Sequence, residues 1–78
     1  MRIIICGAGQ VGYGIAERLA AENHDVTVID IETRLIEKIR DTLDVRGFVG
    51  HGSRPEVLLA ADADKADMLI AVTLFDEV

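Results

Sequence analysis

Several features are scarce in this chain, and each scarcity excludes a class of protein. A single cysteine, Cys6, makes an intrachain disulfide impossible and is typical of a reducing compartment. Only 8 basic residues stand against 14 acidic ones, and the net charge of −6 argues against nucleic-acid binding. No apolar run approaches the roughly 20 residues that span a bilayer. The N-terminus leads directly into a predicted strand, without a signal peptide. We therefore expect a soluble, cytoplasmic protein.

Patterns that serve catalysis or metal binding are also missing. The sequence contains neither CxxC nor HExxH spacing, so we predict no metal site. No base stands beside Cys6 in the sequence, which favours a buried small hydrophobe over a nucleophile. No set of residues resembles a catalytic apparatus. We therefore expect a protein that binds a ligand without chemistry.

The most abundant residues of this chain are aliphatic. Half of its residues are hydrophobic, mostly Ile, Val, Leu and Ala, and only three are aromatic. This composition is typical of a parallel sheet covered by helices. Short apolar runs alternate with stretches of helical spacing. They predict strands at residues 3–6, 26–29, 48–49 and 68–72.

Three helices are predicted between these strands. In the first, Val11, Ile15 and Leu19 fall on one face at i, i+4 and i+8. The last begins near residues 53–56, with Pro55 in its first turn. The order βαβαβαβ predicts an α/β, Rossmann-like fold with parallel strands in the order 3-2-1-4. The first two helices then cover one face of the sheet, and the third covers the other.

The last apolar run, residues 68–72, would form an edge of this sheet, although its composition suits a strand with two neighbours. A dinucleotide-binding fold normally continues into a second half that holds the other nucleotide. We therefore expect residues 1–78 to be the N-terminal part of a Rossmann nucleotide-binding domain, truncated before its second half. The alternative is a domain that completes its sheet through a partner.

A glycine-rich segment at residues 7–12, GAGQVG, connects the first predicted strand to the first helix. Such a turn lets the backbone approach a pyrophosphate, while the helix presents free N–H groups and the positive end of its dipole. A tight turn without a ligand is the alternative. The residues predicted to contact phosphate are Gly7, Ala8, Gly9, Gln10 and Val11.

Asp30 closes the second predicted strand, where a carboxylate accepts hydrogen bonds from a ribose diol. A carboxylate in this place repels a 2′-phosphate, which favours NAD(H) over NADP(H). Further candidates follow the other strands at the same end of the sheet. His51 would stack on adenine, and Thr73 with Leu74 would meet the ribose or pyrophosphate. A solvated residue is the alternative for Asp30 and for His51.

Three segments together resemble one known family. The similarity is to the TrkA family, the regulatory subunits of bacterial Trk potassium uptake. It is found in residues 1–12, in residues 50–58 and in residues 66–73 with the following Asp76 and Glu77. The resemblance covers the whole chain and implies an RCK (KTN) N-terminal domain that binds NAD(H), with ATP or ADP as further ligands. It also implies that the full-length protein is a homo-oligomer at the inner face of the membrane, where it gates a potassium transporter subunit without catalysis.

By position, the family's nucleotide contacts fall on the same residues that the strand ends indicate. They are Gly7, Ala8, Gly9, Gln10, Val11, Asp30, Thr73 and Leu74, with His51 as a weaker candidate. Two other functions stay open from the residues alone. One is the N-terminal half of an NAD-dependent dehydrogenase, and the other is a domain that binds S-adenosylmethionine, because the same fold serves each of them.

Overall fold

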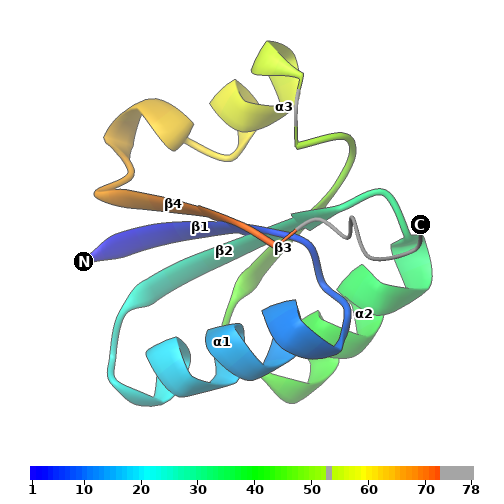
Figure 1. The fold of residues 1–78 in the computed structure, drawn as a ribbon, viewed down its shortest axis with the longest axis vertical. Coiled ribbons are helices and arrows are strands. Elements are labelled where there is room, and N and C mark those ends of the chain that lie inside the picture. The colour runs from blue at the N-terminus through cyan, green and yellow to red at the C-terminus, as the bar shows by residue number, and fades with distance from the viewer. Residues whose placement is uncertain (53, 73–78) are drawn as a thin grey trace.

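The computed structural model describes residues 1–52 and 54–72, in which strands and helices alternate along the chain (Figure 1). The α-helices are α1 (Gln10–Ala21), α2 (Thr33–Thr42) and α3 (Pro55–Ala60). The strands are β1 (Arg2–Cys6), β2 (Asp25–Asp30), β3 (Arg46–Val49) and β4 (Met68–Ala71). A short 3-10 helix, η1 (Ala63–Lys65), precedes β4. The predicted order of elements is therefore confirmed, and Pro55 occupies the first turn of α3, as expected.

The strands form one parallel sheet in the order β3-β2-β1-β4, which confirms the predicted Rossmann-like α/β fold. β1 lies in the interior of the sheet, where Ile5 pairs with Val28 on one side and with Ile70 on the other. Each strand points its carboxyl end to the same edge of the sheet. The loops that follow β1, β2 and β3 therefore gather at that edge.

Helices α1 and α2 cover one face of the sheet, and α3 covers the other (Figure 1). Alternate residues of β1 and β2 enter opposite cores, which explains why these two strands read as continuous apolar runs. The core under α1 and α2 contains Ile3, Ile5, Ala8, Ala16, Val26, Val28, Ile36 and Ile39. The smaller core under α3 contains Ile4, Cys6, Ile29 and Ala61.

Val11 departs from the predicted helix face. Its side chain is 60% exposed, whereas Gly12 and Ala16 are the buried residues of α1. The first turn of the helix rests on backbone, because Gly12 packs directly against the carbonyl of Gly7. Val11 therefore does not pack with the rest of the predicted apolar stripe, whereas Ile15 and Leu19 do pack against the core.

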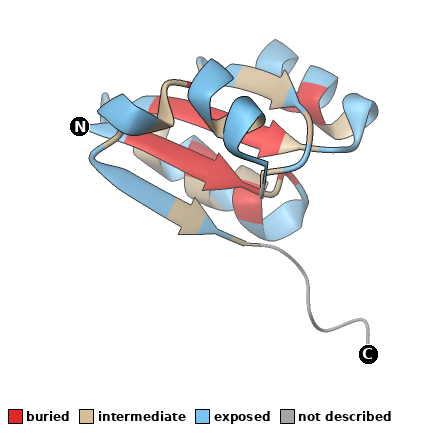
Figure 2. Cartoon of the chain, turned by 90° about the horizontal axis from the view of Figure 1, so that it is seen from above, coloured by how far each residue is buried: buried red, intermediate tan, exposed pale blue. Residues whose placement is uncertain are grey.

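β4 lies at one edge of the sheet in the described part of the chain, and much of it faces solvent (Figure 2). Met68 and Leu69 are 45% and 54% exposed. The sequence predicts that this apolar run forms an edge of the sheet, and the structure agrees. Among the described helices, none is long and apolar enough to cross a membrane, and the longest, α1, has 12 residues.

Candidate nucleotide-binding site

The loop between β1 and α1 places its glycines in three different environments. Gly7 has a φ of +123°, which L-residues rarely adopt, and a Cβ added there would also lie 3.1 Å from the carbonyl oxygen of Val72. A Cβ on Gly12 would lie 1.8 Å from the carbonyl oxygen of Gly7. A Cβ on Gly9, by contrast, would meet nothing within 4 Å. The outer two glycines are thus needed for the turn and for close packing, while Gly9 leaves open space beside the loop.

This open space lies at the N-terminus of α1. Gly9 is the N-cap residue of the helix, and no side chain caps it. The first turn carries no acidic residue, and both Gln10 and Val11 are exposed. The first amides of a helix have no intrahelical acceptor and carry the positive end of the helix dipole. The start of α1 is therefore suited to receive an anion such as a phosphate group.

Asp30 ends β2 directly beside this loop. One carboxylate oxygen, Oδ2, accepts a hydrogen bond from the backbone amide of Ala8 at 2.7 Å, and Oδ1 accepts one from the amide of Glu32 at 2.8 Å. Below it, the amide of Gly7 donates to the carbonyl oxygen of Ile29 at 2.7 Å. Each carboxylate oxygen has two acceptor sites, so the side chain can accept further donors from a ligand.

The loop after β3 reaches the same edge of the sheet. The amide of Gly50 donates to the carbonyl oxygen of Asp30 at 2.9 Å. A Cβ added to Gly52 would lie 2.8 Å from the sulfur of Cys6, so this loop packs closely against the end of β1. Between these two glycines, His51 is exposed. His51 is thus placed at the candidate site, but at its solvent side.

Cys6 is buried under this loop, as its sequence context predicts. It is 7% exposed, and burial raises the pKa of its thiol above the ordinary value. The neutral thiol packs as a small hydrophobe in the core under α3. Within the described residues, no group of three or more His, Cys, Asp or Glu side chains is placed to hold a metal ion.

The structure therefore brings the predicted glycine-loop residues and Asp30 together and places His51 near them. Thr73 and Leu74 lie outside the described residues. Two backbone groups that organise the site do not appear in the sequence prediction, namely the amide of Glu32 and the carbonyl of Ile29. An aspartate often accepts a hydrogen bond from the amide two residues on, so Asp30 itself carried a signal for Glu32. The role of Ile29 depends on strand register, which the sequence alone does not specify.

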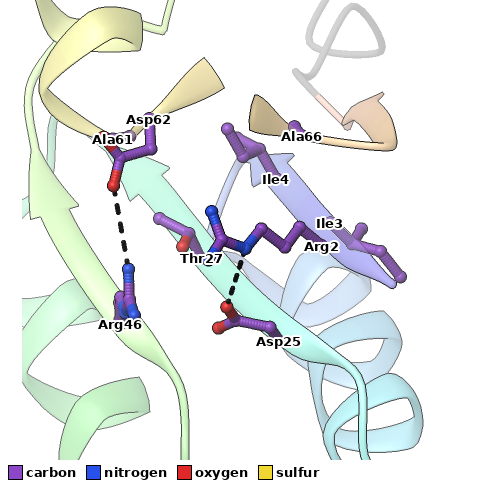
Figure 3. A pocket seen from close by; sticks show the side chains of 9 residues that line it. All are labelled: Arg2, Ile3, Ile4, Asp25, Thr27, Arg46, Ala61, Asp62 and Ala66. Carbon is purple, nitrogen blue, oxygen red and sulfur yellow. Dashed lines mark ion pairs between the residues drawn. The ribbon is translucent and has the colours of Figure 1, made fainter. Parts of the chain in front are cut away.

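A small cavity lies at the opposite end of the sheet, where the strands begin (Figure 3). Its volume is about 10 Å³, which is enough for one water molecule. Two ion pairs border it. Nε of Arg2 lies 3.6 Å from Oδ2 of Asp25, and Nη1 of Arg46 lies 3.9 Å from Oδ2 of Asp62. This cavity is too small for a nucleotide.

The profile of the TrkA-N domain family matches residues 3–78. The chain belongs to the TrkA-N family. Over 78 residues it is 63% identical to the Trk system potassium uptake protein TrkA of Azorhizobium caulinodans. Over 77 residues it is 49% identical to the protein of the same name from Vibrio alginolyticus. These matches cover 100% and 99% of this chain but 17% of each relative, so the TrkA-N chain spans a small part of the length of these proteins.

A solved structure extends the comparison of folds. The TrkA-N chain superposes on the Kef CTD of Shewanella denitrificans, in its AMP-bound form, with a TM-score of 0.74 and 26% sequence identity. The match covers 88% of this chain and 40% of that one. The resemblance to TrkA proteins is thus confirmed, and the relatives named here are potassium-uptake proteins rather than dehydrogenases.

Proposed function

We propose that this chain is the N-terminal nucleotide-binding module of a regulatory protein for Trk-type potassium uptake, and that it binds an adenine nucleotide without turning it over. One observation carries this proposal. The carboxylate of Asp30 lies 2.7 Å from the amide of Ala8, inside the glycine-rich loop at the uncapped start of α1. An acceptor for a ribose diol and donors for phosphate therefore stand side by side.

The comparisons support the adenine part of the ligand. The Kef CTD, which shares this fold, was solved with AMP bound. Phosphate would contact the loop at Gly7, Ala8, Gly9, Gln10 and Val11, and the ribose would contact Asp30. His51, together with Thr73 and Leu74, would complete the site from neighbouring strand ends.

Among adenine nucleotides, we propose NAD(H) as the main ligand, with ATP and ADP as further ligands. The negative charge of Asp30 opposes the 2′-phosphate of NADP(H). The next residue is Ile31, which is 60% exposed, so the position after Asp30 offers no cation to offset that repulsion.

The proposed regulatory role is supported by the names of the relatives, which are Trk system potassium uptake proteins. This chain corresponds to 17% of the length of the TrkA proteins that it matches. In the full-length protein, residues 1–78 would form the N-terminal part of an RCK (KTN) Rossmann domain. Nucleotide binding would bias the arrangement of this domain within a cytoplasmic homo-oligomer, and a membrane potassium transporter subunit would respond to that arrangement.

Calorimetric titration tests the proposed ligand. The chain is titrated with NADH, NADPH, ADP, ATP and S-adenosylmethionine, and the series is repeated with Asp30→Ala. Asp25→Ala, at the other end of β2 and 43% exposed at its side chain, serves as the control. We expect NADH and ADP to bind, and Asp30→Ala to weaken both about tenfold or more, because hydrogen bonds to a charged acceptor are lost.

Two results would contradict the proposed function. Selective binding of S-adenosylmethionine over NADH would indicate a methyltransferase-like domain. Hydride transfer from NADH to any substrate would indicate a dehydrogenase half. Circular dichroism of each variant distinguishes a lost binding site from a lost fold.

A further inference from the structure

Ala8 donates its amide to a side chain at a point where backbone pairing between β1 and β2 ends. The register pairs Cys6 with Ile29, and the amide of Gly7 then donates to the carbonyl oxygen of Ile29. The next amide, that of Ala8, donates to Oδ2 of Asp30 at 2.7 Å. Ala8 is only 3% exposed and belongs to the main core, so its amide has little access to water. The carboxylate of Asp30 thus takes the place of a backbone acceptor.

Asp30 also fixes two other segments at this edge. Its Oδ1 accepts from the amide of Glu32, which is the N-cap residue of α2. Its carbonyl oxygen accepts from the amide of Gly50, in the loop after β3. One residue therefore joins the glycine-rich loop, the start of α2 and the loop that carries His51.

We infer that Asp30 is a positioning residue that sets the shape of the glycine-rich loop before any ligand arrives, in addition to its proposed contact with ribose. Only the consequence for ligand affinity rests on the proposed function. A loop that is already ordered loses less conformational freedom on binding, so it binds phosphate more tightly. Loss of the carboxylate should therefore weaken the binding of ligands that make no ribose contact at all.

The ligand-free protein tests the positioning role directly. Amide hydrogen exchange is followed by NMR in the unmodified chain, in Asp30→Ala and in the control Asp25→Ala. We expect the amides of Ala8 and Glu32 to exchange about tenfold faster or more in Asp30→Ala, relative to the core amides of the same protein. Asp25→Ala should leave this ratio unchanged. An unchanged ratio for Ala8 in Asp30→Ala would overturn the inference.

Asp30→Asn keeps the test valid if the alanine variant does not fold. The asparagine side chain has one carbonyl oxygen, and its amino group donates and cannot accept. Because the amides of Ala8 and Glu32 reach different oxygens of Asp30, this one carbonyl oxygen can replace the acceptor of only one of them. We expect one of these two amides to exchange about tenfold faster and the other to keep its protection. Full protection of both amides would overturn the inference.

A ligand without a ribose diol separates the two roles of Asp30. ADP and 2′,3′-dideoxyadenosine diphosphate are titrated into the unmodified chain and into Asp30→Ala. If Asp30 only contacted ribose, the substitution would leave affinity for the dideoxy ligand unchanged, and that result would contradict the positioning role. We expect its affinity to fall about threefold or more. If the unmodified chain binds no ADP, the proposed function fails, and the exchange measurement still decides the positioning role.

Discussion

Gly12 faces the backbone of Gly7 so closely that a Cβ on Gly12 would lie 1.8 Å from the carbonyl oxygen of Gly7. Backbone lies on both sides of this contact, so no flexible side chain can move aside. The first turn of α1 and the glycine-rich loop can therefore keep their shape only with glycine at this position. Gly14, two residues further along the same helix, is exposed and has nothing within 4 Å of an added Cβ.

Gly12→Ala is expected to lower the free energy of unfolding by about 2–3 kcal/mol, because the loop and helix must separate. The matched control, Gly14→Ala, should raise it by about 0.5–1 kcal/mol, since alanine favours the helix and meets no neighbour. Urea unfolding followed by circular dichroism measures both. Equal effects of the two substitutions would show that the contact with Gly7 does not constrain the loop.

Gly9→Ala should separate ligand binding from stability. The space beside Gly9 is open, and its φ of −72° is accessible to alanine. We expect the free energy of unfolding to change by less than about 0.5 kcal/mol. The methyl group would nevertheless occupy the approach of the phosphate, and NADH affinity should fall about tenfold or more by calorimetry. If the folded variant binds NADH with unchanged affinity, the phosphate does not bind beside this loop.

The beginnings of β1 and β4 are joined through Arg2 and Asp67. The amide of Arg2 donates to Oδ2 of Asp67 at 2.8 Å, and the amide of Asp67 donates to the carbonyl oxygen of Arg2 at 2.7 Å. Asp67→Ala removes the first bond and should lower the free energy of unfolding by about 1 kcal/mol. Asp67→Asn retains an acceptor oxygen and should recover most of this loss. If both variants unfold at the same urea concentration, the side-chain bond contributes little to the edge strand.

Asp30→Asn should reduce the preference for NADH over NADPH. The neutral side chain no longer repels a 2′-phosphate, while the loop defect affects both ligands alike and cancels in the ratio of their affinities. We expect the unmodified chain to prefer NADH about tenfold or more, and the variant to lose most of this ratio. Parallel titrations measure it. A ratio that survives the substitution would place the 2′-position away from Asp30.

The buried thiol of Cys6 predicts a loss of stability at alkaline pH. Burial raises the pKa of Cys6 in the folded state, whereas the unfolded chain ionises near the ordinary value of 9.0. Its contribution to stability is therefore complete below that value and is lost as pH rises through the folded pKa. Urea unfolding at about pH 7 and about pH 10 should show a larger decrease for the unmodified chain than for Cys6→Ala. Equal decreases would show that the thiol ionises alike in both states.

Much of the fold could be predicted because β1 and β2 are buried on both faces and therefore read as uninterrupted apolar runs. The place of Asp30 could also be predicted, since it follows directly from the end of such a run. The exposure of Val11 does not follow from the apolar spacing, because the first turn of α1 is set by a contact between Gly12 and Gly7 that involves backbone alone. The hydrogen bond from the amide of Ala8 to Asp30 could not be predicted either, because it depends on the register of two strands and on the path of the loop between them.

The helices on the two faces of the sheet differ in how many buried residues they contribute. α2 contributes the fully buried Ile36 and Ile39, whereas α3 spans Pro55–Ala60 and has no buried residue. We therefore expect local unfolding of α3 to cost less free energy than release of α2, so that this side opens first in the native ensemble. His51 precedes the first residue of α3, Pro55, closely in the chain, and we expect it to open with this helix. A protease that needs an opened substrate would cut on the α3 side while the strands under α1 and α2 stay paired.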